Sequence, residues 1–221
     1  MGPTLLERAW EEREEVVYPS MFGDIGPGIY PIPPAVFSDV FGEAADPRWL
    51  HVGVFASPPS QERPHWVFVT SGLSNPWESD EPPTDPAEPS WLGVEYVFRC
   101  TQGGDWAIRM VQRVAAFALL LAHGRYPGRE PLRVGDRIPL RGPVIPASDS
   151  ALTWLVVCPP SSDPINFRLE SGSVEFVQLV AVTDAEANLA RAQGLEPLLQ
   201  VLRSAGAYAV TDPDRMSAVA G

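Results

Sequence analysis

Two segments decide the fold: HWVFVTSGLSNPW at residues 65–77 and SWLGVEYVFR at residues 90–99. In both segments aromatic and β-branched residues recur at every second position, as Trp66, Phe68 and Thr70 do in the first. A period of two is typical of a strand whose faces meet different surroundings. The two segments therefore predict two strands, which residues 75–90 join in one long excursion.

Further strands and a long helix are expected downstream. The apolar stretches 152–158 and 174–182 predict central strands that are covered on both faces. Between Asp105, an expected N-cap, and the pair His123–Gly124, nearly the whole circumference of the predicted helix is apolar. Such a helix lies buried against a sheet.

The helices at the two ends of the chain have clear start signals. Thr4 with Glu7, and Thr183 with Glu186, have the spacing of capping boxes. We expect Pro19 to end the first helix. Since strands and helices follow one another irregularly, the sequence predicts an α+β fold with a mixed, largely antiparallel β-sheet, a buried central helix and flanking helices.

The strand pair resembles the signature of the suppressor of fused (SUFU) domain family, in which Trp-x-Phe-x-Thr/Ser-x-Gly-Leu-Ser precedes Gly-x-x-Glu-Leu/Tyr-x-Phe-Arg. Other segments resemble this family in the same order: 30–42, 47–57, 106–119, 135–144, 171–191 and 209–217. We accordingly expect an N-terminal helix with a Gly/Pro-rich lead-in at 1–29, a suppressor of fused-like domain at 30–217 and a C-terminal tail at 218–221. Gly93 stands where the family also has glycine, which predicts a positive φ or a close backbone approach.

The resemblance implies protein binding without catalysis. Animal members of the family hold a peptide of a transcription factor as an added strand between two domains, whereas bacterial members are thought to be immunity proteins that neutralise toxins. The single-domain length and acidity of this chain suit the bacterial role. The hypothesis is a non-enzymatic bacterial immunity-type module that binds a basic protein partner such as a toxin, by strand addition or face docking.

Charge and composition narrow the partner and the chemistry. The 221 residues have a formal net charge of −12, which disfavours nucleic acid, and all 16 basic residues are arginine. Without lysine there is no Walker loop, Schiff base or Ser-x-x-Lys centre. No apolar run is long enough to span a membrane, and no secretory signal is apparent, so we expect a cytoplasmic location.

The expected partner-binding residues lie in and beside the loop between the two strands. Its composition, rich in proline and acids, favours disorder, while its acids could steer a cationic partner toward the neighbouring strand face. The candidates are Glu78, Asp80, Glu81, Asp85, Glu88, Glu95 and Tyr96. For Glu95 itself the leading interpretation is a charge on the sheet that is either paired or exposed.

An enzyme is the alternative hypothesis. It would be a hydrolase or a small-molecule enzyme with a pocket near Trp49, Trp66, Glu95 and Tyr96, although aromatic clusters of this kind are more often core. The three histidines lack the spacing of a metal site, and no catalytic, metal or cofactor residue is assigned. Cys100 and Cys158, without CxxC spacing, are expected to be small buried residues.

Overall fold

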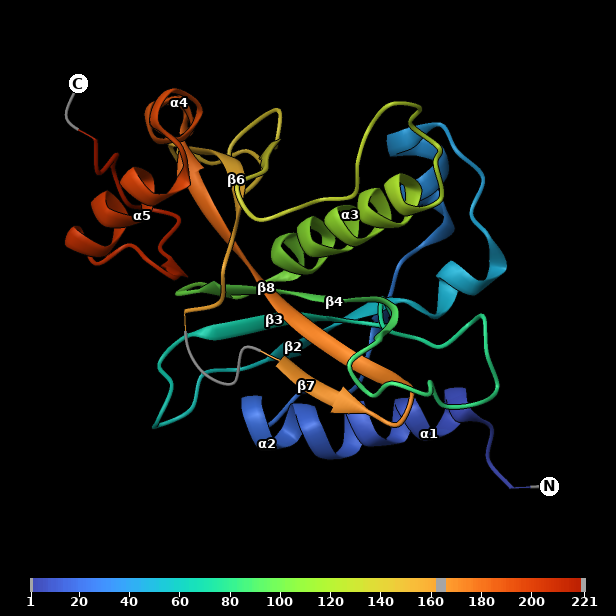
Figure 1. Ribbon diagram of the computed structural model, residues 1–221. Helices are drawn as coiled ribbons and strands as arrows, with labels where there is room; N and C mark the ends of the chain where they lie inside the picture. Colours follow the sequence, from blue (N-terminus) through green and yellow to red (C-terminus); the bar gives the residue numbers. More distant parts are fainter. Residues whose placement is uncertain (1, 162–165, 220–221) are drawn as a thin grey trace.

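The computed structural model describes residues 2–161 and 166–219, and its framework is one β-sheet (Figure 1). Within the described residues the sheet has nine strands: seven follow the order β1-β2-β3-β4-β8-β6-β5, β7 also pairs with β8, and β9 also pairs with β4. The strands are β1 (Tyr30–Pro31), β2 (Gly53–Ser57), β3 (Trp66–Ser71), β4 (Pro89–Cys100), β5 (Arg137–Pro139), β6 (Leu152–Cys158), β7 (Asn166–Leu169), β8 (Gly172–Thr183) and β9 (Val210–Thr211).

Strand directions confirm the expected mixed sheet. β4 runs parallel to β8 and β9, and the other pairings are antiparallel. The two strands of the opening motif, β3 and β4, are antiparallel neighbours with Phe68 opposite Phe98. On its other side β4 pairs with β8, where Glu95 is opposite Phe176. The motif strand β4 thus lies at the centre of the sheet, between β3 and β8.

Helices cover both faces of this sheet. α3 lies on one face, while α1 and α2 lie on the other (Figure 1). The helical elements are α1 (Leu5–Glu11), the π-helical η1 (Glu12–Val17), α2 (Tyr18–Phe22), the π-helical η2 (Val36–Phe41), the 3₁₀ turn η3 (Pro47–His51), α3 (Asp105–Ala122), α4 (Asp184–Gln193) and α5 (Leu195–Ser204). Among the described residues, no helix is both long and apolar enough to cross a membrane.

Side chains alternate along β3 and β4, as the sequence predicts, and they contribute to a separate apolar layer on each face of the sheet. Phe68 and Phe98 belong to the core cluster under α3, together with Val111 and Leu119 of that helix. Val67, Val69 and Val97 point to the opposite face, where they pack with Tyr18, Phe55 and Phe176. Each fully buried side chain of this size contributes about 1.5–3 kcal/mol. The two faces of β3 and β4 therefore hold both helical layers to one sheet.

Two helix boundaries differ from the sequence-based expectation. Helical structure continues past Pro19 to Phe22, because Pro19 occupies the first turn of α2, where a missing N–H is tolerated. Gly104, not Asp105, is the N-cap of α3, and no side chain caps that end. Asp105 is instead the first helical residue and faces Arg109 at 3.7 Å. Both predicted capping boxes, at Thr4 and Thr183, are present.

The backbone at Gly93 is as predicted. Its φ is 62°, and a Cβ at this position would lie 2.5 Å from Cβ of Pro89. Both conditions restrict the position to glycine. This turn lies within the early part of β4, where the register against β8 shifts between Pro89 and Val94.

Candidate functional site

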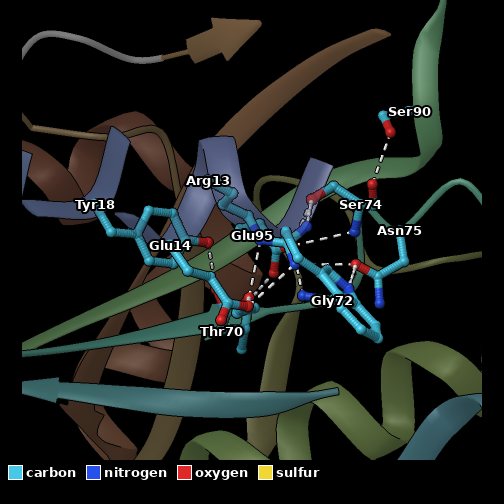
Figure 2. Close-up of polar contacts among 11 residues, drawn as sticks. Arg13, Glu14, Tyr18, Thr70, Gly72, Ser74, Asn75, Ser90 and Glu95 are labelled. Atoms are coloured by element: carbon cyan, nitrogen blue, oxygen red, sulfur yellow. Dashed lines mark hydrogen bonds and ion pairs between the residues drawn. The ribbon is translucent and has the colours of Figure 1, made fainter. Parts of the chain in front are cut away.

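A buried carboxylate is the centre of a polar network in the interior. Glu95, on β4, is completely buried, and its oxygens accept four hydrogen bonds (Figure 2). Thr70 Oγ1 donates to Oε2 at 2.6 Å. The backbone N–H groups of Gly72 and Ser74 donate to Oε1 at 3.0 Å, and Ser74 Oγ donates to the same oxygen at 2.7 Å. Residues 70–74, which end β3 and begin the following turn, thus enclose the carboxylate of the adjacent strand.

A buried arginine joins this carboxylate to the N-terminal helix. Arg13, on η1, is also completely buried. Its guanidinium donates to Ser71 Oγ at 2.8 Å, Ser74 Oγ at 3.0 Å and Asn75 Oδ1 at 3.0 Å. Residues 71–75 therefore bind a cation from the helix on one side and the anion of Glu95 on the other (Figure 2). Charges at such depth are retained only when they are paired and hydrogen-bonded.

Two neighbouring residues extend this network along the same helix. Ser71 Oγ donates to Glu14 Oε1 at 2.6 Å. The buried hydroxyl of Tyr18 donates to the carbonyl oxygen of Thr70 at 2.6 Å. Helical spacing places Arg13, Glu14 and Tyr18 toward the sheet. The network fixes the N-terminal helix against the end of β3.

The electrostatics of Glu95 reflect two opposing influences. Burial raises its pKa, while Arg13 and the hydrogen bonds from Ser74, Thr70 and Gly72 act to lower it. Burial also raises the pKa of Tyr18 well above the usual value for tyrosine. The chain itself supplies all the hydrogen-bond donors described for the carboxylate of Glu95. The carboxylate is therefore enclosed, and its role is structural: it holds residues 70–74 to β4.

Glu95 and Tyr96, which the sequence assigned to the partner-binding face, are both internal. Glu95 has no exposed surface and Tyr96 is 2% exposed. Tyr96 belongs to the core cluster under α3, and burial raises the pKa of its hydroxyl well above the usual value for tyrosine. A partner docked on the native surface cannot reach either side chain. Of the two interpretations of Glu95 weighed from the sequence, paired or exposed, the exposed one is wrong: the carboxylate is buried and hydrogen-bonded, and no ion pair of Glu95 occurs among the described residues.

The five acidic candidates of the loop lie elsewhere, on the surface. All are exposed: Glu78, Asp80, Glu81, Asp85 and Glu88. The loop has a defined path in the structure, and both of its ends are fastened at the polar network. Asn75 is buried beside Arg13, and Ser90 Oγ donates to the carbonyl oxygen of Ser74 at 2.6 Å. The network thus holds the base of the loop while its acids face solvent.

An aromatic group beside this loop was missed by the sequence reasoning. His51, at the end of η3, stacks on Trp10 with ring centroids 5.7 Å apart, and its other neighbour is Trp77 at 5.6 Å. His51 is exposed and the two tryptophans are partly exposed. Trp10 Nε1 donates to Asn75 Oδ1 at 2.9 Å, which connects the group to the network. We call Trp10, His51, Trp77 and the five loop acids the aromatic–acidic surface.

No periodicity in the sequence could have found this group, because its three members come from three separate segments. The one available signal was that Trp77 directly precedes the acidic run. Tryptophan is enriched at the centres of protein interfaces, where its large area is buried at low entropic cost. The surface therefore has the composition of a protein-docking site, with aromatic residues next to a charged border.

The residues of the alternative enzyme hypothesis do not meet in a site. Trp49 is 1% exposed and packs against Phe37 and His123 in the core. Trp66 stacks on Phe68. Glu95 is held by the network described above. Nor do the described residues contain a group of three or more His, Cys, Asp or Glu side chains placed to hold a metal ion.

Both cysteines are free and buried, as expected. Burial raises the pKa of each thiol to about 12. Since the thiolate is the reactive form, neither Cys100 nor Cys158 is placed as a nucleophile.

Comparison with known proteins identifies the family. The sequence profile of Suppressor of fused protein (SUFU) matches residues 48–216, which is most of the chain. The chain therefore belongs to this family, which confirms the resemblance seen in the sequence. A search of curated protein sequences gave no match.

Three solved structures have the same fold. The Drosophila Suppressor of Fused is 22% identical with a TM-score of 0.58, and the match covers 76% of this chain and 42% of that one. A chain of a Sufu–Fu complex is 22% identical with a TM-score of 0.59, over 86% and 93% of the two chains. A SUFU homologue from Neisseria gonorrhoeae is 20% identical with a TM-score of 0.56, over 77% and 79%. This chain thus matches less than half of the Drosophila protein.

Proposed function

We propose that this chain is a non-enzymatic protein-binding module of the immunity type, which acts in the cytoplasm and neutralises a basic protein partner such as a toxin. The single observation that carries the proposal is the aromatic–acidic surface, where five exposed acids border the group formed by Trp10, His51 and Trp77. A relative has been crystallised as the Sufu–Fu complex, which is consistent with a family fold used for binding.

The two parts of the surface have separate physical roles. Exposed acids attract a cationic partner over a Debye length of about 10 Å at 0.1 M salt, and thereby raise the association rate. The aromatic side chains lose water on docking and so determine how long the complex lasts. The anchoring of Asn75 and Ser90 keeps the base of the loop in place, which lowers the ordering entropy lost on binding.

The interior supports a binding role over catalysis. The carboxylate of the buried Glu95 accepts four hydrogen bonds from the chain itself. A general acid or base must come within hydrogen-bond reach of its substrate, and a carboxylate enclosed in this way does not. Glu95 and its donors, which belong to the family signature, therefore have a structural role next to the aromatic–acidic surface.

Capture from native lysate tests the proposal. Three baits are used: the natural chain, a variant with Asp80→Arg and Glu81→Arg, and a control with Asp149→Arg and Asp184→Arg, which has the same charge change at exposed acids outside the loop. The natural chain and the control should retain the same basic protein at low salt, and the loop variant should lose it. A captured partner that is acidic, or equally retained by the loop variant, contradicts the proposal. The immunity role further requires that co-expression relieves the toxicity of the captured protein.

A further inference from the structure

A second surface with the opposite charge lies along α3. A groove of about 1480 Å³ runs between this helix and the segment 126–147, with residues 39–41 at one end. In Figure 1 that segment leaves the C-terminal end of α3 and passes back alongside the helix. The acids of the aromatic–acidic surface do not line it.

The floor of the groove is apolar. One side of α3 contributes Trp106, Met110, Val114, Phe117 and Leu121, which recur at helical spacing. The facing segment adds Ile138 and Leu140, both partly exposed. α3 thus has two apolar sides: one packs on the sheet, and the other forms this floor. On the floor side Met110, Val114 and Leu121 are buried, whereas Trp106 and Phe117 are partly exposed. The second apolar side of α3 explains why almost the whole circumference of the helix is apolar in the sequence.

The rim of the groove is rich in arginine. Six of the 16 arginines of the chain line it: Arg109, Arg113, Arg129, Arg133, Arg137 and Arg141. Three acids lie among them: Asp39, Glu130 and Asp136. The lining therefore has a formal net charge of +3, whereas the whole chain has a net charge of −12. This concentration of positive charge contrasts sharply with the rest of the molecule.

Ion pairs among the described residues engage few of these arginines. Arg109 faces Asp105 at 3.7 Å and Arg133 faces Glu130 at 3.1 Å, both in exposed pairs, which contribute little to stability. For Arg113, Arg129, Arg137 and Arg141, no ion pair occurs within the described ranges 2–161 and 166–219. Four guanidinium groups without an ion pair among the described residues thus surround an apolar floor that is partly buried.

We propose that this groove binds an acidic peptide segment of a protein partner, whose Asp and Glu side chains pair with the arginine rim while its apolar side chains fill the floor. The volume exceeds the roughly 300–1,000 Å³ of small-ligand pockets, and the length of α3 suits a segment of several residues. Arginine is suited to carboxylates because its planar guanidinium can donate two parallel hydrogen bonds. The apolar floor favours a peptide over a nucleic-acid backbone, which would need phosphate contacts throughout.

This site is distinct from the aromatic–acidic surface, and its occupant has the opposite charge. The two proposals can therefore fail separately. Random peptides of about 12 residues, displayed on phage and selected on the natural chain, provide the first test. Acidic peptides with Leu, Ile, Phe or Trp anchors should be enriched over the starting library. Enrichment of basic or uncharged peptides overturns the proposal.

The selected peptide is then labelled with fluorescein and titrated by anisotropy. Arg113→Glu combined with Arg129→Glu should weaken binding at least tenfold, since each substitution replaces attraction by repulsion. The control, Arg168→Glu with Arg191→Glu, changes net charge equally at exposed positions outside the groove and should leave the affinity within about twofold. A peptide in which every Glu is replaced by Gln and every Asp by Asn should bind the natural chain as weakly as the original peptide binds the variant with Arg113→Glu and Arg129→Glu.

Three further results overturn the proposal. The first is equal loss of affinity in the groove and control variants, which would show only an effect of net charge. The second is groove-dependent binding of a labelled single-stranded oligonucleotide without binding of any acidic peptide. The third is a self-associated chain in sedimentation velocity, dissociated by the Arg113→Glu and Arg129→Glu pair, which would make a second copy the occupant.

Discussion

Arg13 and Glu95, far apart in the sequence, are both completely buried and share one serine hydroxyl. Ser74 Oγ accepts a hydrogen bond from Arg13 at 3.0 Å and donates one to Glu95 at 2.7 Å. The serine connects a cation of the N-terminal helix to an anion of the central strand. Loss of either charge removes part of the compensation of the other, and a buried charge that is incompletely compensated is costly. Arg13 keeps the carboxylate of Glu14, 3.3 Å from its guanidinium.

Glu95→Gln should destabilise the protein by about 3–5 kcal/mol, the usual cost of removing one partner from a buried charged network. The amide keeps the size of the side chain but turns an acceptor into a donor that faces Thr70 Oγ1 or the N–H groups of Gly72 and Ser74. Urea unfolding followed by tryptophan fluorescence measures the loss as a lower midpoint. A midpoint within error of the natural chain would show that the carboxylate charge is not needed.

Arg13→Met should also destabilise strongly, and the double variant Arg13→Met with Glu95→Gln should be less unstable than the sum of the two. Residues in one hydrogen-bond network couple by about 0.5–3 kcal/mol. Arg8→Met is the matched control, because Arg8 is partly exposed and bonds the exposed Glu170 and the carbonyl oxygen of Pro3. It should cost much less than Arg13→Met. Additive single effects would show that Arg13 and Glu95 act independently.

The strands that carry this network could be predicted from the sequence, but its hydrogen bonds could not. Period-two alternation placed Phe68 and Val67 on opposite faces of β3 because hydrophobic burial depends on side-chain type and spacing. The partners of Glu95 depend instead on which turn closes over it, and residues 72–74 reach it through backbone N–H groups that any residue but proline has. Sequence alone could therefore place the strand but not the donors around its carboxylate.

Gly93→Ala should lower stability by about 1–3 kcal/mol, since the added Cβ would meet Pro89 at 2.5 Å and the φ of 62° is unfavourable for alanine. Gly142→Ala is the control, because a Cβ there meets nothing within 4 Å and no positive φ is required. Differential scanning calorimetry should show a Tm several degrees lower for the first variant and almost unchanged for the second. Equal Tm values for both variants would contradict the strain argument.

Stability should fall as the pH drops from about 6.5 to 4, and His65 should account for part of that loss. Burial, then Arg63 and Arg99, lowers the pKa of His65 to about 4. Over this interval the unfolded chain binds a proton at His65 and the folded chain does not, so acid favours unfolding. The effect is about 1–2 kcal/mol once the partial exposure of the ring is taken into account.

His65→Gln removes the titrating group, so its unfolding free energy should vary less with pH over this interval. Unfolding in urea at a series of pH values measures the difference between the two chains. The difference should be constant above pH 7, where the imidazole is neutral in both states, and should change only below it. Parallel curves for the two chains from pH 7 to 4 would show that His65 is not responsible.

The aromatic–acidic surface illustrates a second limit of sequence reasoning. The five loop acids could be named from the sequence, because a run of charge and proline is visible in any one segment. Trp10 and His51 could not, since they join Trp77 only after the N-terminal helix and η3 have docked. Placing Glu95 and Tyr96 on the binding face failed for the related reason that β4 is a central strand, covered on both faces.

The last prediction separates the roles of loop charge and aromatic residues in binding. Asp80→Arg with Glu81→Arg should slow association with a basic partner far more than it speeds dissociation, because border charges act mainly on the encounter. Trp77→Ala should do the reverse and raise the dissociation rate, as expected for a residue at the centre of an interface. Surface plasmon resonance at several salt concentrations gives both rates, and the salt dependence of association should decrease in the charge variant. Circular dichroism must first show that Trp77→Ala is folded, since its indole is partly buried. If deletion of Glu78–Glu88 leaves the association rate and its salt dependence unaltered, the acidic loop has no part in recognition.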